Sequence, residues 1–144
     1  MMKENILLIA VRLPDQDEHK FTTSITELQS LSETAGGVVQ KVITQRRARI
    51  HPATYIGEGK INEIKGQIDE LGIDLVISND ELSPSQLRNL IDRFGVPLID
   101  RSQLILDIFA QRAKTREGQL QVELAQLQYM LPRLYGQGTV LSRL

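Results

Sequence analysis

The sequence predicts an α/β fold: a four-stranded parallel sheet with flanking helices, followed by a helical extension at the C-terminus. Strand-like apolar runs alternate with segments of helical spacing, which is the pattern of parallel strands joined by crossover helices. The first run, Ile6–Val11, is continuously apolar, as expected of a strand buried on both faces. After Asp100 the strand-like runs stop and only helical spacing remains.

Each element is marked by its own start and stop signals. In chain order the expected elements are a strand at Ile6–Val11, a helix capped by Ser24 and ending near Gly36, a strand at Val38–Thr44, a helix opened by Gly57–Gly59 and ended by Gly72, a strand at Gly72–Ile77, a helix capped by Ser83 and a strand at Gly95–Ile99. Ser83, Pro84 and Gln86 together form a capping box with proline at the first helical position. These elements divide the chain into an α/β subdomain at residues 1–100 and a helical extension at residues 101–144.

The helical extension carries a narrow stripe of leucines. Asp100 or Ser102 is expected to cap its first part, Gly118 to weaken it, and Pro132 to kink or fray its end. Its leucines repeat with the spacing of a coiled-coil seam, and they are Leu120, Leu124, Leu127, Leu131 and Leu134. On a single helix such a leucine seam would be exposed to water. We therefore expect the seam to pack on the sheet of its own chain or on a partner helix, including one from another copy of the chain.

Composition narrows the classes of function. The chain has 144 residues, of which 41% are hydrophobic and 24% charged, as in ordinary globular domains. It has no cysteine, which excludes disulfide scaffolds, cysteine-based zinc sites and thiol catalysis. No apolar run is long enough for a membrane span, and the first residues do not resemble a signal peptide. A cytoplasmic location is therefore expected.

The net charge of −1 conceals basic segments that are candidates for phosphate binding. Residues 36–65 carry six basic against two acidic side chains, and residues 101–144 carry six against three. The candidate RNA-binding residues are Arg46, Arg47, Arg49, Arg112, Lys114, Arg116 and Arg133. Arginine suits phosphate because its planar guanidinium binds two oxygens at once. With three Phe, three Tyr and no Trp, base stacking is not expected, and solvated helix faces explain the same charges without a ligand.

Other candidate sites are weaker. Gly57, Gly59 and Lys60 stand at a predicted helix start, where free backbone N–H groups can bind phosphate, but the string lacks the spacing of a P-loop. The guanine-recognition string N-K-x-D is absent. Carboxylates that follow the third and fourth strands could hold Mg²⁺, yet each also suits a helix N-terminus. The sequence predicts no catalytic residue and no metal site.

Several strings together resemble the N-terminal region of HflX-type GTPases, a family of ribosome-associated translational GTPases. The strings are Thr44–Arg47, Pro52–Lys60, Asp80–Leu90, Asp100–Ala113, Thr115–Leu127 and Leu131–Leu134. The resemblance covers nearly the whole chain. It implies that an α/β subdomain precedes a pair of long antiparallel helices and a GTPase domain, and that the helical extension forms half of that pair.

The resemblance also implies a function. In this family the N-terminal part binds the large ribosomal subunit, while a GTPase domain binds GTP and Mg²⁺, so that ribosomes are split or rescued. The chain itself shows no P-loop, so no cofactor is expected in it. The expected partners are large-subunit rRNA and the GTPase domain of the parent protein. An alternative is a stand-alone α/β domain that binds a nucleotide or regulates a GTPase domain.

Overall fold

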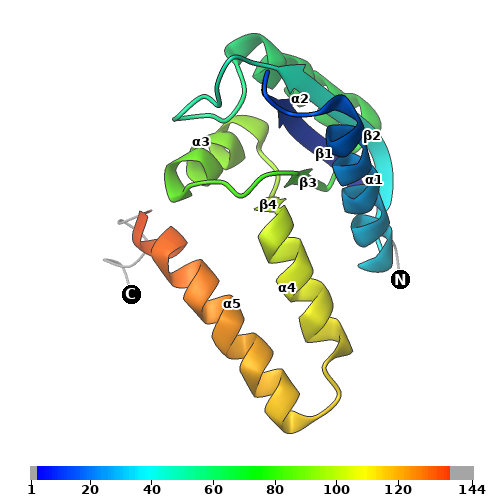
Figure 1. Cartoon of the computed structure of the whole chain (residues 1–144), viewed down its shortest axis with the longest axis vertical. Helices are drawn as coiled ribbons and strands as arrows, with labels where there is room; N and C mark the ends of the chain where they lie inside the picture. The colour runs from blue at the N-terminus through cyan, green and yellow to red at the C-terminus, as the bar shows by residue number, and fades with distance from the viewer. Residues whose placement is uncertain (1–2, 137–144) are drawn as a thin grey trace.

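Four parallel strands form a sheet within residues 3–136, the part of the chain that the computed structural model describes, with side chains as far as Arg133. The strands are β1 (Asn5–Arg12), β2 (Val38–Arg46), β3 (Leu75–Ser78) and β4 (Leu98–Asp100). The helices are α1 (Glu18–Thr34), α2 (Glu58–Leu71), α3 (Pro84–Phe94), α4 (Arg101–Arg112) and α5 (Arg116–Gly136). The spatial order of the strands is β2-β1-β3-β4, so the predicted parallel sheet with flanking helices is confirmed (Figure 1).

Strand β1 lies inside the sheet, between β2 and β3, and its apolar run is buried on both faces. Its side chains alternate between two cores. Ile6 and Leu8 pack with residues of α1 and α4, whereas Leu7 and Ile9 pack with residues of α2 and α3. Because helices cover both faces, no position of this strand needs a polar side chain. This burial explains the continuous apolar run.

Helix caps agree with the sequence at most positions and differ at one. The capping box of Ser83 and Gln86 is present, and Gly72 and Gly95 end their helices with positive φ angles of 62° and 72°. The predicted cap at Ser24 is wrong, because Asp17 caps α1 by accepting a hydrogen bond from the Lys20 amide at 2.9 Å. Ser24 instead lies inside the helix and hydrogen-bonds Asn79.

Strand β2 is longer than predicted. Gln45 and Arg46, which lie beyond the predicted strand end at Thr44, pair in register with Val11 and Arg12 at the carboxyl end of β1. Two basic side chains are thereby brought to neighbouring positions at one edge of the sheet.

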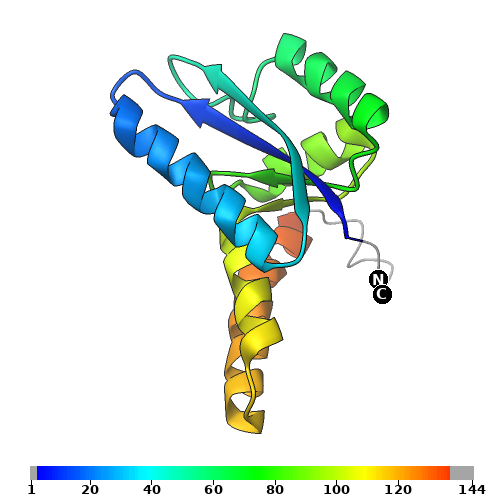
Figure 2. The ribbon, with the colours of Figure 1, turned by 90° about the vertical axis from the view of Figure 1, so that its right-hand side faces the viewer.

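The helical extension is a hairpin of two helices (Figure 2). Asp100 caps α4 by accepting from the Gln103 amide. The break falls at residues 113–115 rather than at Gly118, because the Thr115 hydroxyl accepts from the Gly118 amide and starts a new helix. Helix α5 then runs back beside α4 toward α3 and continues past Pro132 to Gly136 (Figure 1). Among the described residues, no helix is both long and apolar enough to cross a membrane.

Candidate nucleic-acid interface

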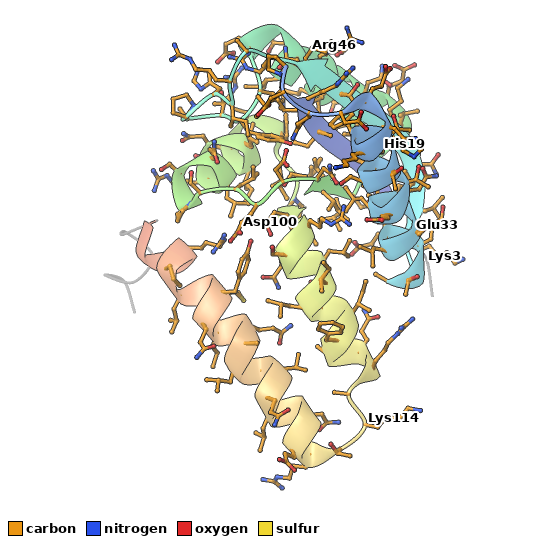
Figure 3. The ribbon with its side chains drawn as sticks, viewed as in Figure 1. Lys3, His19, Glu33, Arg46, Asp100 and Lys114 are labelled. Atoms are coloured by element: carbon orange, nitrogen blue, oxygen red, sulfur yellow. The ribbon has the colours of Figure 1, made fainter. Side chains whose placement is uncertain are left out.

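Four arginines gather at the carboxyl ends of β1 and β2, and we call this group the arginine edge. Its members are Arg12, Arg46, Arg47 and Arg49. Arg12 and Arg46 are register partners on the two strands, and the Arg47 amide donates to the Arg12 carbonyl at 3.1 Å. Figure 3 shows Arg46 at the end of the molecule opposite the helical hairpin. Sequence analysis missed Arg12, although it directly follows the predicted strand Ile6–Val11, and the parallel register makes it the neighbour of Arg46.

The surface is hollowed on both sides of Arg47. One hollow of about 460 Å³ is lined by Arg12, Arg46 and Arg47 together with the small apolar residues of the adjoining loops. A second hollow of about 540 Å³ is lined by Arg47, Arg49 and His51 together with Ile50 and Pro52. Among the described residues, no acidic side chain lines either hollow. Both hollows can therefore accept anionic groups.

The loop after β2, which carries Arg47 and Arg49, is held by several hydrogen bonds. His51 and Tyr55 form an antiparallel bridge across it, and the His51 Nδ1 atom accepts from the Ala53 and Thr54 amides. From α3, the Gln86 side chain donates to the His51 carbonyl at 2.9 Å. The neighbouring Asn89 side chain likewise donates to the Ala53 carbonyl at 2.8 Å. The loop is thus fixed before any ligand arrives.

Tyr55, buried in the core, anchors the same loop to the sheet. It is fully buried and adopts a positive φ of 66°, a strained conformation for a side chain of its size. Its hydroxyl donates to the Asp80 carboxylate and accepts from the Val11 amide at 3.0 Å. Burial, followed by the charge and hydrogen bond of Asp80, raises the pKa of the Tyr55 hydroxyl far above its usual value. Sequence analysis assigned Tyr55 no role, because its backbone conformation leaves no local signal.

The second predicted basic cluster is divided by the fold. Arg112, Lys114 and Arg116 lie at the hairpin tip, where α4 turns into α5, and Figure 3 shows Lys114 at that end. Arg133 lies near the other end of α5, so the four residues do not form one surface.

Arg133 belongs to an internal network that we call the clasp, made of Arg133, Tyr129, Asp100 and Glu81. Its guanidinium donates to Glu81 at 3.0 Å and to the Leu82 carbonyl at 3.1 Å, and it lies 3.7 Å from the Asp100 carboxylate. It also stacks on the Tyr129 ring, 3.5 Å from the centroid. The Tyr129 hydroxyl donates to Asp100. Burial and this hydrogen bond raise the Tyr129 pKa well above its usual value. The clasp joins α5 to the α/β subdomain.

The weak phosphate candidates are engaged with neighbours. The Gly57 amide donates to the Gln45 side chain at 3.0 Å, and Lys60 pairs with Glu63 at 2.9 Å. Gly59 lies in the first turn of α2. Between them, Glu58 makes a two-pronged ion pair with Arg93, whose hydrogen bonds lower the Glu58 pKa. An anion at this helix start would have to approach the Glu58 carboxylate.

The leucine seam does not fold back on the sheet. Leu120, Leu124, Leu127 and Leu131 are 44–57% exposed, and the Leu134 side chain lies outside the described residues. Helix α5 packs through a different face, which carries Tyr129 and Arg133. The expectation that the seam packs on its own sheet is therefore wrong, and pairing with another helix stays a prediction.

The acidic residues near the sheet edge are also engaged. Asp80 accepts from Tyr55, Asp100 accepts from the Leu82 and Gln103 amides, and Glu81 pairs with Arg133. Within the described part of the chain, no group of three or more acidic or histidine side chains could hold a metal ion.

The fold and the arginine edge define a doubly wound α/β domain with an appended helical hairpin. This arrangement has known counterparts among GTP-binding proteins. Residues 22–110 match the family model "GTP-binding GTPase N-terminal", and residues 112–144 match "GTP-binding GTPase Middle Region". A GTP-binding protein from Sulfolobus solfataricus, solved in complex with GDP, superposes with a TM-score of 0.69 at 25% identity, over 96% of this chain and 40% of that one.

The chain belongs to the HflX family of GTP-binding GTPases. The GTPase HflX of Alkalihalophilus pseudofirmus is 55% identical over 97% of this chain and 33% of its own length. The GTPase HflX of Escherichia coli is 44% identical over 88% of this chain and 30% of its own length. The chain thus spans about a third of these relatives, and it corresponds to their N-terminal and middle regions.

Proposed function

We propose that this domain docks an HflX-type GTPase onto the large ribosomal subunit by binding the phosphates of rRNA. The arginine edge is the observation that carries the proposal, because it presents four guanidinium groups around hollows that no described acidic side chain lines. GTP and Mg²⁺ would bind in a part of the full-length protein outside this chain, and hydrolysis there would accompany ribosome splitting or rescue in the cytoplasm.

A second candidate function is regulation of the GTPase domain by direct contact. The exposed leucine seam favours it, since apolar side chains at this spacing typically pack on another helix. This contact can coexist with ribosome docking, because the seam lies along α5 of the hairpin, whereas Figure 3 shows Arg46 at the opposite end of the molecule. A nucleotide site at Gly57 and Lys60 has less support, because both groups already have internal partners.

Co-sedimentation with purified large and small ribosomal subunits across a salt series tests the proposal. We expect selective binding to the large subunit that weakens steeply as salt rises, since phosphate contacts release counterions. Equal binding to both subunits, or binding that is insensitive to salt, would contradict rRNA docking. Binding to an isolated HflX GTPase domain, without binding to ribosomes, would support the regulatory function instead.

A further inference from the structure

The arginine edge differs from the other basic surfaces in how its hollows are arranged. The two hollows are neighbours, because Arg47 lines both of them. Its Nε atom donates to the Arg49 carbonyl at 3.0 Å, which fixes the direction of the guanidinium. Two adjoining anion-accepting hollows with one shared cation suit a ligand with repeated negative charges better than a single phosphate.

The side chains around the hollows have unused hydrogen-bonding capacity. Arg46 and Arg49 make no ion pair or hydrogen bond through their side chains with other described residues. Arg12 has only a loose contact with the exposed Glu18, at 4.0 Å. His51 accepts two backbone amides at Nδ1, so in its neutral form the proton lies on Nε2 and remains available to a ligand.

The chemistry of the walls selects the kind of polyanion. No Phe, Tyr or Trp side chain lines either hollow in the described part of the chain, so bases have no ring on which to stack. The donors are guanidinium and imidazole groups, which suit phosphate oxygens. A loop fixed in advance by α3 and by Tyr55 favours a ligand whose phosphates are also fixed in space, as they are along an RNA double helix.

We propose that the two hollows on either side of Arg47 form a track for successive backbone phosphates of double-helical RNA. Arg12 and Arg46 hold one phosphate, Arg49 and His51 hold the next, and Arg47 contacts both. The inference rests on the proposed docking function and specifies its site: the sheet edge, not the hairpin tip, contacts RNA. Binding is independent of base sequence, because only the backbone is contacted.

Fluorescence anisotropy with a labelled RNA duplex of about 16 base pairs, the length that shape-reading modules cover, tests the track. The variant carrying Arg46→Gln and Arg49→Gln removes two cations that have no side-chain partner in residues 3–136, so its fold is expected to be unchanged. The matched control carries Arg112→Gln and Lys114→Gln at the hairpin tip, with the same loss of charge. Far-ultraviolet circular dichroism and a thermal midpoint verify the folding of both.

We expect the edge variant to bind the duplex about ten-fold more weakly for each arginine at 0.1 M salt, with the salt slope reduced by about 0.9 per lost contact. The tip variant should keep the affinity and slope of the parent chain. A tip variant that loses binding while the edge variant keeps it would overturn the track and leave rRNA docking intact.

Co-sedimentation of the same variants with large subunits separates the two proposals further. Parallel loss of duplex and large-subunit binding in the edge variant supports the track as the docking site. Normal large-subunit binding by the edge variant would overturn the track alone. If the parent chain binds neither the RNA duplex nor large subunits, the docking function and the track are both overturned.

Discussion

The arginine edge and the clasp place the same residue type in opposite surroundings. At the arginine edge, Arg46 and Arg49 have no side-chain partner among the described residues and reach into solvent. In the clasp, the Arg133 side chain is only 16% exposed and is held by Glu81, Asp100 and a backbone carbonyl. A basic side chain is therefore most available to a polyanion where the fold gives it no close acidic partner. The comparison predicts which arginines support stability and which support binding.

Among the arginines, the largest expected effect is on Arg133. Replacement by Gln leaves the buried Asp100 carboxylate without its cation and removes the stacking on Tyr129, so we expect a loss of about 2–4 kcal/mol in the free energy of unfolding. The matched change Arg46→Gln should alter it by less than about 0.5 kcal/mol. Urea unfolding followed by circular dichroism measures both. Equal losses would show that the two arginines have the same structural role.

A second, smaller effect distinguishes the two tyrosines that donate to carboxylates. Tyr55→Phe removes a fully buried hydroxyl that serves both Asp80 and the Val11 amide, so we expect a loss of about 2–3 kcal/mol. Tyr129→Phe removes one hydrogen bond at a partly exposed position and should lose about 1 kcal/mol. Chemical denaturation of the two variants under one condition provides the comparison. A larger loss for Tyr129→Phe would mean that the clasp, not the loop anchor, is the more stabilising network.

The sequence predicted the elements of the fold better than the partners of its side chains. The buried run at Ile6–Val11 and the capping box at Ser83 were predicted correctly, because each depends only on residues that are close in sequence. Asp17 and Ser24 are both good caps, and no local pattern shows that Ser24 hydrogen-bonds Asn79, which lies far away in sequence. The acidic partners of an arginine can likewise come from distant parts of the sequence. The sequence therefore identified the basic segments, but not which of their arginines form ion pairs.

The candidate site shows the same division. Arg46, Arg47 and Arg49 were found because they stand together in sequence, and the structure does place them together at one edge. Arg12 was missed because only the register of two parallel strands brings it to Arg46. Arg133 was grouped with the hairpin tip because sequence distance along one helix does not show that its acidic partners come from other elements.

The leucine seam provides a third comparison, between exposed and buried leucines of the helical extension. Changing Leu124 and Leu127 together to Gln should alter the free energy of unfolding by less than about 1 kcal/mol, because both side chains face solvent. Leu104→Ala, at a buried position of α4, should lose about 2–4 kcal/mol. If another copy covers the seam, sedimentation velocity will show self-association of the parent chain that the double variant lacks. A parent chain that stays monomeric at every concentration would exclude this pairing.

The smallest expected effect concerns the ion pair between Arg93 and Glu58. Arg93 is paired, like Arg133 in the clasp, but it is also exposed to solvent, like Arg46 at the arginine edge. Hydrogen bonds from Arg93 lower the Glu58 pKa, so the ion pair stabilises the folded state at neutral pH. Because the folded pKa is depressed, that stabilisation is present above the usual Glu pKa and is lost as the pH falls through the lower folded value. Glu58→Gln should therefore be slightly less stable than the parent chain near neutral pH and equally stable in acid. High salt should also shrink the difference at neutral pH, since both side chains are exposed to solvent. A difference that persists in acid would show that the loss does not come from the charge of Glu58, because the carboxyl group is neutral there.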